Sequence, residues 1–216
     1  MKKKIAVLGS TGSIGLTTLK IINNDKKNFD IILLTANTNY KKLFNQAKKF
    51  NCKNLIIYNK EKYLESLKFN KNNNLKIFHK TKDFLINFKK KIDFTMSAIT
   101  GIDGLEPTLD LIKFSNYIAI ANKESIICGW NLIEKKLKKY KTNFIPVDSE
   151  HFSIWTLIKN YRSSEIKKVF ITASGGPFLD LPLSNFKKIK IKDAIKHPNW
   201  NMGKKISIDS ASMMNK

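Results

Sequence analysis

Short segments that are apolar at consecutive positions alternate along the chain with longer segments of helical spacing. Strands that are apolar throughout are buried on both faces, and helices between them connect neighbouring strands in parallel. The pattern therefore predicts an α/β fold with a doubly wound parallel sheet. We expect strands at residues 4–9, 29–37, 54–59, 75–79, 92–99, 117–122, 143–148 and 167–174, and helices at 13–25, 40–51, 104–114, 125–140 and 151–161.

The character of the sequence changes near residue 145. Beyond it the expected elements are shorter, and the chain contains Gly-Gly-Pro, Pro-Asn-Trp and a run of Ser and Met. We interpret residues 1–145 as the sheet domain and residues 146–216 as the start of a second, catalytic segment.

The chain of 216 residues carries 40 Lys and Arg against 17 Asp and Glu, a formal charge of +23. Such an excess ordinarily favours an anionic partner, either nucleic acid or a phosphorylated substrate. Here the lysines are spread over nearly every segment and accompany many Asn, Ile and Phe. This distribution favours the codon bias of an AT-rich genome as the cause of the positive charge. Because no arginine-rich tract or RNA-binding aromatic motif is present, we expect no nucleic-acid partner.

Cysteine content and hydropathy indicate the compartment. Cys52 and Cys128 form neither a disulfide framework nor a metal-ligand spacing, which favours a reducing environment. No apolar run approaches the roughly 18 residues that span a bilayer. We therefore expect a cytoplasmic protein with no membrane partner.

The stretch "GSTGSIG", residues 9–15, lies between the first expected strand and the first expected helix. Glycine permits a tight turn with positive φ, and a glycine without Cβ lets a pyrophosphate approach the backbone. The helix N-terminus then offers N–H groups to the anion. The spacing G-x-x-G-x-x-G is less specific than G-x-G-x-x-G, but its place between strand and helix favours a dinucleotide site.

The end of the second expected strand reads "TANTN", with Asn37, Thr38 and Asn39 and no acid. Enzymes that prefer NAD usually carry Asp or Glu there to bind the ribose hydroxyls. The missing acid, with Lys41 and Lys42 nearby, is compatible with the 2′-phosphate of NADP. An equally good interpretation is that these residues only begin a helix.

Two carboxylates, Asp148 and Glu150, follow a buried strand within "FIPVDSEHFS". If the strand continued through them, both side chains would leave on the same side and could bind Mg²⁺ or Mn²⁺ through oxygen. Alternatively, Asp148 or Ser149 could cap a helix that begins near His151. Spacing alone does not decide between the two.

Three later stretches carry polar groups suited to a phosphorylated substrate. They are "TASGGPF" at 172–178, "KHPNWNMGKK" at 196–205, with a histidine and a tryptophan in a loop that could act as a lid, and "DSASMMNK" at 209–216, with Ser210 and Ser212. Each is weak evidence alone, and their clustering after a dinucleotide fold is what favours a site.

Taken together, "GSTGSIG", "ANKES", "PVDSEH", "SGGPF" and "HPNW.MG.KIS.DSA.MMNK" resemble the 1-deoxy-D-xylulose 5-phosphate reductoisomerase family in order and approximate spacing. The resemblance implies a Rossmann-like domain at 1–145 and an incomplete α/β catalytic domain at 146–216. It implies NADPH contacts at Thr11, Gly12, Ser13, Ile14, Asn39, Asn122, Glu124 and Gly203, and metal ligands at Asp148 and Glu150. It implies substrate contacts at Lys123, Ser149, Glu150, Ser174, His197, Ser210, Asn215 and Lys216, lid residues at Trp200 and Met202, and catalytic roles for Asp148, Glu150, Lys123 and His197.

The activity implied by this resemblance belongs to non-mevalonate isoprenoid synthesis. A divalent metal, Mg²⁺ or Mn²⁺, assists a carbon-skeleton rearrangement of a sugar phosphate, and NADPH reduces the resulting aldehyde to 2-C-methyl-D-erythritol 4-phosphate. The resemblance also implies a homodimer for the full-length protein.

The chain departs from the family pattern in two ways. Asn37 and Thr38 stand where many members carry Gly and a basic residue, and the family's third metal carboxylate would lie three residues beyond Lys216. We therefore expect a truncated chain without the C-terminal helical domain, which binds NADPH at best and has little or no activity alone.

Two other functions are compatible with parts of the sequence. Semialdehyde-type dehydrogenases share the glycine spacing and NADP but attack through a cysteine, and Cys128 lies in a helical pattern without the setting of a nucleophile. A basic, non-enzymatic binding module would bind duplex DNA with a steep salt dependence and ignore NADPH.

Overall fold

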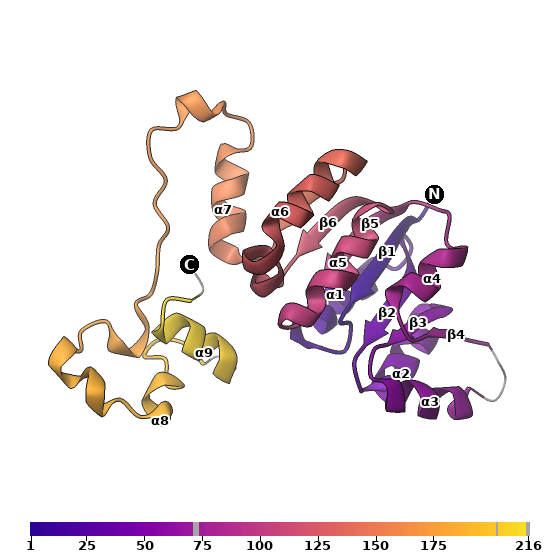
Figure 1. The fold of residues 1–216 in the computed structure, drawn as a ribbon, viewed down its shortest axis with the longest axis horizontal. Helices are drawn as coiled ribbons and strands as arrows, with labels where there is room; N and C mark the ends of the chain where they lie inside the picture. Colours follow the sequence, from indigo (N-terminus) through magenta and orange to yellow (C-terminus); the bar gives the residue numbers. More distant parts are fainter. Residues whose placement is uncertain (71–73, 202, 215–216) are drawn as a thin grey trace. The chain divides into compact units, whose positions relative to one another are not determined.

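The structure is a computed structural model that describes residues 1–70, 74–201 and 203–214. The chain divides into two compact units, Met1–Val147 and Asp148–Lys216. In the first unit strands and helices alternate (Figure 1). Its strands are β1 (Lys3–Leu8), β2 (Phe29–Ala36), β3 (Asn54–Ile57), β4 (Lys76–Phe78), β5 (Ile92–Ser97), β6 (Ser115–Ile120) and β7 (Asn143–Pro146). Its helices are α1 (Ser13–Asn24), α2 (Tyr40–Phe50), α3 (Lys60–Phe69), α4 (Thr81–Asn87), α5 (Leu105–Ile112) and α6 (Lys123–Tyr140).

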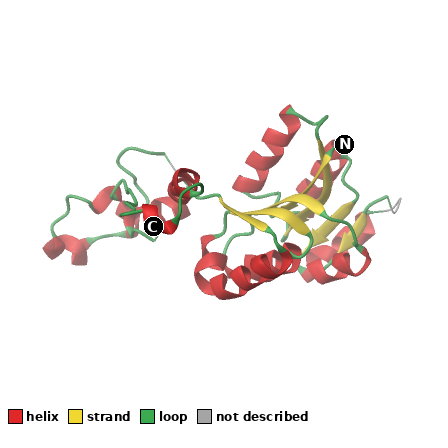
Figure 2. Ribbon diagram, turned by 90° about the horizontal axis from the view of Figure 1, so that it is seen from above, coloured by secondary structure: helices red, strands yellow, loops and turns green. Residues whose placement is uncertain are grey.

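The seven strands form one sheet in the order β4-β3-β2-β1-β5-β6-β7, and all of their pairings are parallel. Helices cover both faces of the sheet (Figure 2). The winding direction reverses between β1 and β5, and ligands of doubly wound sheets bind at the carboxyl ends of the strands at such a reversal. The predicted doubly wound parallel sheet is confirmed.

The apolar strands supply two cores, one on each face of the sheet. Ile5 and Val7 of β1 belong to one buried cluster, which includes side chains of α1 and α2. Ala6 and Leu8 point into the other cluster, which includes side chains of α4 and α5. Burial on both faces explains why β1 is apolar at consecutive positions.

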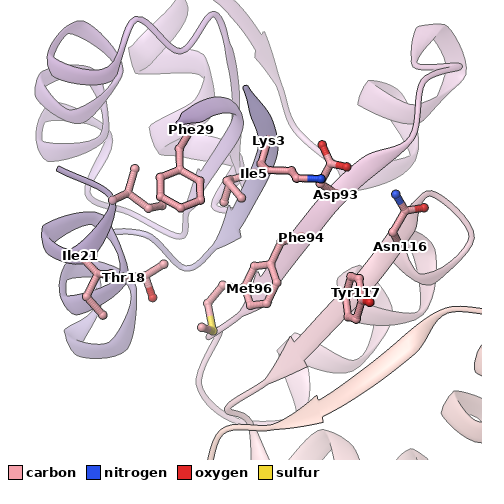
Figure 3. A pocket seen from close by; sticks show the side chains of 11 residues that line it. Lys3, Ile5, Thr18, Ile21, Phe29, Asp93, Phe94, Met96, Asn116 and Tyr117 are labelled. Atoms are coloured by element: carbon pink, nitrogen blue, oxygen red, sulfur yellow. The ribbon is translucent and has the colours of Figure 1, made fainter. Parts of the chain in front are cut away.

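An open groove of about 510 Å³ lies beside α1, on the face of the sheet that this helix covers (Figure 3). Ile21 of α1 stands on one side of it, and Phe94 and Met96 of β5 and Tyr117 of β6 stand on the other. Tyr117 exposes 48% of its surface. Part of the apolar surface of β5 and β6 is therefore accessible to solvent in this unit.

Two helices of the first unit are absent from the sequence-based expectation. Helix α3 is only weakly amphipathic, because its buried residue is the polar Ser66 and not an apolar side chain. The helix begins where the Asn59 side chain accepts the N–H of Lys62 at 2.9 Å. Helix α4 spans seven residues, too few for helical periodicity to stand out.

The second unit contains α7 (Ser149–Ile158), α8 (Ile191–Ala194), α9 (Lys204–Ala211) and short 3-10 turns. The predicted strand at 167–174 is wrong, because these residues pair with no neighbouring strand and the described part of this unit contains no strand. Phe170 exposes 76% of its surface. An apolar run becomes a strand only when a neighbour takes its backbone hydrogen bonds.

Candidate functional site

The glycine turn lies at the carboxyl ends of β1 and β2. Gly9 has φ of +76° and donates its N–H to the Thr35 hydroxyl at 2.8 Å. A Cβ at Gly9 would lie 2.7 Å from the Ala98 carbonyl oxygen, and a Cβ at Gly15 would lie 2.3 Å from the Gly9 carbonyl oxygen. The packing of the protein itself therefore requires glycine at both positions.

Gly12 is different, because a Cβ there would come no nearer than 3.4 Å to another atom, the Gly9 carbonyl oxygen. It is the N-cap of α1, whose first turn has neither a side-chain cap nor an acidic residue. Gly12, Ser13 and Ile14 are exposed, and Thr11 is half-buried. The N–H groups at the start of α1 and the open surface of this turn fit a pyrophosphate, which the helix N-terminus attracts.

The segment after β2 begins α2, as one of the two interpretations expected. Asn39 accepts the N–H of Lys42 at 3.1 Å and so caps the helix. Asn37, Thr38 and Asn39 are all exposed. Because the cap uses the side-chain oxygen of Asn39, this residue fixes the start of α2 in addition to any contact that it makes with a ligand.

Asn122 lies at the start of α6 with 3% of its surface exposed. Its side-chain oxygen accepts the N–H of Ser125 at 2.9 Å, and its amide donates to the carbonyls of Ile99 and Gly101. Both ends of the side chain thus bind protein groups. Asn122 positions the loop after β5 and the half-buried Lys123 and Glu124 in the first turn of α6.

The carboxylates of the second unit lie at the start of α7. Strand β7 ends at Pro146 and does not continue through Asp148 and Glu150, so of the two open interpretations the structure shows the helix cap. Asp148 is instead the N-cap, and its carboxylate oxygen Oδ1 lies 2.7 Å from His151 Nδ1. The Ser149 hydroxyl donates to Glu150 at 2.7 Å. Carboxylate oxygens are the ligands that Mg²⁺ and Mn²⁺ prefer, and the described residues contain no group of three or more side chains able to hold a metal.

A second polar cluster joins three predicted substrate residues. His197 exposes 8% of its surface, and its Nδ1 accepts the backbone N–H groups of Asn199 and Trp200 at 3.1 and 3.2 Å. The ring proton must then lie on Nε2, which donates to the Ser174 hydroxyl at 3.0 Å. Ser174 lies 3.2 Å from the Ser210 hydroxyl. The cluster presents hydroxyl and imidazole donors, which suit an anionic oxygen.

Backbone geometry brings this cluster together. Gly175 and Gly176 both have positive φ, and a Cβ at Gly176 would lie 2.9 Å from the Ala211 Cα of α9. The glycines of "SGGPF" therefore let the chain turn closely against α9 and place Ser174 beside Ser210.

Two further predicted residues, Gly203 and Trp200, lie at and just before the start of α9. Gly203 is its exposed N-cap, and Trp200 is exposed in the loop before it. Met202, Asn215 and Lys216 lie outside the described residues.

Cys128 is exposed on α6. Residues that the sequence analysis did not single out include Thr35 and Gln46, which hold the glycine turn through tertiary contacts.

Comparisons with known proteins point to one family. The family model described as 1-deoxy-D-xylulose 5-phosphate reductoisomerase matches residues 5–129, and the model of its C-terminal domain matches residues 144–216. A curated reductoisomerase from Pelagibacter ubique is 60% identical over 216 residues, covering 99% of this chain and 56% of the relative. One from Halothermothrix orenii is 39% identical over 217 residues, covering 100% and 56%.

Solved structures are similar over the same region. The reductoisomerase from Zymomonas mobilis in complex with NADPH has a TM-score of 0.88 at 33% identity, covering 100% of this chain and 55% of that one. A reductoisomerase in complex with NADPH, fosmidomycin and magnesium has a TM-score of 0.82 at 33% identity, covering 99% and 55%. The chain thus spans about half the length of these proteins. Within the described residues, no helix has the length and apolarity needed to cross a membrane.

Proposed function

Because this chain belongs to the 1-deoxy-D-xylulose 5-phosphate reductoisomerase family, we propose that it forms part of an enzyme that converts 1-deoxy-D-xylulose 5-phosphate to 2-C-methyl-D-erythritol 4-phosphate. Residues 1–145 form the NADPH-binding domain, and residues 146–216 form part of the catalytic domain. The observation that carries the proposal is the glycine turn at the reversal of the sheet. Packing within the protein does not require glycine at position 12, and Gly12 leaves the backbone open to a ligand.

The first unit binds and orients the cofactor. Backbone N–H groups at Thr11, Ser13 and Ile14 receive the pyrophosphate beside Gly12, whose own N–H donates to the Gly9 carbonyl. Asn39, Asn122 and Glu124 are further cofactor contacts of this unit, and Gly203 of the second unit is one more. A bound NADPH supplies hydride for the reduction. Asn122 also holds the first turn of α6, since both ends of its side chain bind backbone groups.

Asp148 and Glu150 are the residues that would hold the divalent cation, and both offer hard oxygen donors. When bound, Mg²⁺ or Mn²⁺ supplies Lewis-acid polarisation of substrate oxygens. Lys123 and Ser149 contact the substrate. Ser174, His197 and Ser210, with Asn215 and Lys216, hold its phosphate, while Trp200 and Met202 exclude water from the reacting groups.

The test uses the complete protein. NADPH oxidation, followed by absorbance, is expected to require both 1-deoxy-D-xylulose 5-phosphate and Mg²⁺ or Mn²⁺, and Asp148→Asn is expected to lower turnover at least about 100-fold. Turnover that persists in Asp148→Asn would remove the metal assignment. Phosphate-dependent acylation through Cys128 would instead favour a semialdehyde-type dehydrogenase.

We also propose that the complete protein is a cytoplasmic homodimer, as the family resemblance implies, and that its basic charge serves no nucleic-acid partner. Sedimentation of the complete protein tests the dimer. Binding of duplex DNA at physiological salt, with a steep salt dependence, would contradict the second statement.

A further inference from the structure

Helix α2 is fixed to the glycine turn by two side chains. The Lys42 ammonium donates to the Thr11 carbonyl at 3.1 Å. One helical turn later, the Gln46 amide donates to the Ser10 carbonyl at 2.9 Å and accepts the Ser10 hydroxyl at 2.7 Å. Residues four apart lie on the same face of a helix. This face of α2 therefore places a positive charge directly at the turn proposed to bind the pyrophosphate.

The position of this charge matters for the ribose of a dinucleotide. The end of the second strand is where proteins of this fold read the ribose 2′ position, with an acid for NAD or a basic residue for NADP. Asn37 and Thr38 occupy that end here and are exposed. Lys42 brings an ammonium to the adjoining turn, and since an ammonium has three N–H donors, the bond to Thr11 leaves it able to bind a phosphate oxygen as well.

Lys41, its neighbour in sequence, has a different environment. Successive helical residues point about 100° apart, so the side chains of Lys41 and Lys42 differ in direction. The pKa of the Glu65 carboxyl in α3 is lowered chiefly by Lys62, less by Tyr40, and also by the charge of Lys41. Lys41 is exposed, whereas Lys42 is half-buried. The two lysines that the sequence leaves equivalent are thus distinguished by the structure.

We propose that Lys42 binds the 2′-phosphate of NADPH and is the residue that makes this chain prefer NADPH to NADH. The inference rests on the proposed function, since it concerns the cofactor of the same site. It assigns the specificity to α2 rather than to the end of β2.

The experiment measures dissociation constants of NADPH and NADH for the 216-residue chain by nucleotide fluorescence. Lys42→Met is expected to weaken NADPH binding about 10- to 100-fold, the worth of one charge-assisted hydrogen bond, and to leave NADH binding within about twofold. Lys42→Arg should keep the preference for NADPH. Lys41→Met, the matched control, should change neither constant by more than about twofold.

Two results with the Lys42→Met chain would overturn the assignment of Lys42. One is equal weakening of NADPH and NADH, which would mean that Lys42 only supports the turn through Thr11. The other is a Lys42→Met chain that still prefers NADPH as strongly as the original chain. If the original chain binds neither nucleotide, the proposed cofactor site fails and the inference fails with it. If the original chain binds NADH at least as tightly as NADPH, the cofactor site stands and only the role of Lys42 in cofactor preference is contradicted.

Discussion

The Asp148 carboxylate accepts the backbone N–H of His151 at 3.3 Å and lies 2.7 Å from the imidazole Nδ1 of the same residue. The proposed metal ligand is therefore also the N-cap of α7. The two interpretations that the sequence leaves open are not exclusive, because one carboxylate oxygen can cap the helix while the carboxylate as a whole remains a candidate ligand.

Substitution at Asp148 should separate these two roles. Asn caps helices as well as Asp does, while Ala removes the cap at a cost of about 1 kcal/mol. Hydrogen exchange of the α7 amides should therefore be unchanged in Asp148→Asn and faster in Asp148→Ala. In the complete protein, both variants should lose Mn²⁺ affinity, measured by electron paramagnetic resonance. Unchanged Mn²⁺ affinity in Asp148→Asn would leave the residue as a cap alone.

The glycines of the turn should respond differently to alanine. A Cβ at Gly15 would lie 2.3 Å from the Gly9 carbonyl oxygen, so Gly15→Ala should destabilise the chain by about 1–3 kcal/mol in urea unfolding. Gly12→Ala should leave stability nearly unchanged and weaken NADPH binding, measured by fluorescence titration. If Gly12→Ala bound NADPH as tightly as the original chain, the pyrophosphate would not approach the backbone at Gly12.

Asn122 should be intolerant of a change that keeps its shape. Asn122→Asp retains an oxygen for the N–H of Ser125 but turns the donor that faces the carbonyls of Ile99 and Gly101 into an acceptor. A buried, unsatisfied charge costs about 3 kcal/mol or more, so the urea midpoint should fall. Lowering the pH should restore part of the loss, because a protonated carboxyl can donate again. A midpoint equal to that of the original chain would contradict the burial of this amide.

Asp110 should make stability depend on pH. Burial raises the pKa of its carboxyl, opposed by Lys82. In the folded chain Asp110 then stays protonated to higher pH than in the unfolded chain. Stability therefore falls as the pH rises from the unfolded-state pKa of Asp110 to its folded-state pKa. Asp110→Asn should stabilise the chain at pH 7 by about 0.5 kcal/mol after solvent screening and give no gain at pH 3. The exposed Asp103, changed to Asn, controls for the lost charge, and an equal gain in both variants would rule out burial as the cause.

The two cysteines should differ in reactivity. Burial raises the pKa of the Cys52 thiol to about 12, whereas Cys128 is exposed. The thiolate is the reactive form, so a thiol reagent at pH 8 should label one cysteine in the native chain and two after unfolding. Cys128→Ser should abolish the native labelling. Rapid native labelling of Cys128→Ser would mean that Cys52 is accessible.

The sheet could be predicted because its strands are buried on both faces. Seven of the eight expected strands are present, since a continuous apolar run such as that of β1, followed by a helix, is typical of a strand in a parallel sheet. The run at 167–174 has the same composition, but strand formation depends on a neighbour, and composition carries no information about that neighbour. Helix α3 was missed because it buries little apolar side-chain surface, and helix α4 was missed because it has only seven residues.

The family and its motifs could be predicted from residues 9 to 216, and the family matches confirm that resemblance. The roles of the individual site residues stay predictions. Sequence spacing left open whether the strand continues through Asp148 and Glu150 or a helix is capped there, and in the structure the strand ends at Pro146 and Asp148 caps a helix. The contacts of Gln46 with the glycine turn join residues 36 apart, and no local pattern reveals such a pair.

The bonds from Lys42 and Gln46 to adjacent residues of one turn also limit how the length of this region can vary. An inserted residue between them would rotate one side chain by about 100° about the helix axis, and either the ammonium or the amide would leave the turn. The loop at 51–53, beyond the end of α2, carries no such constraint from the turn. Homologous chains that keep both contacts should therefore vary in length after α2 but keep four residues of spacing within it.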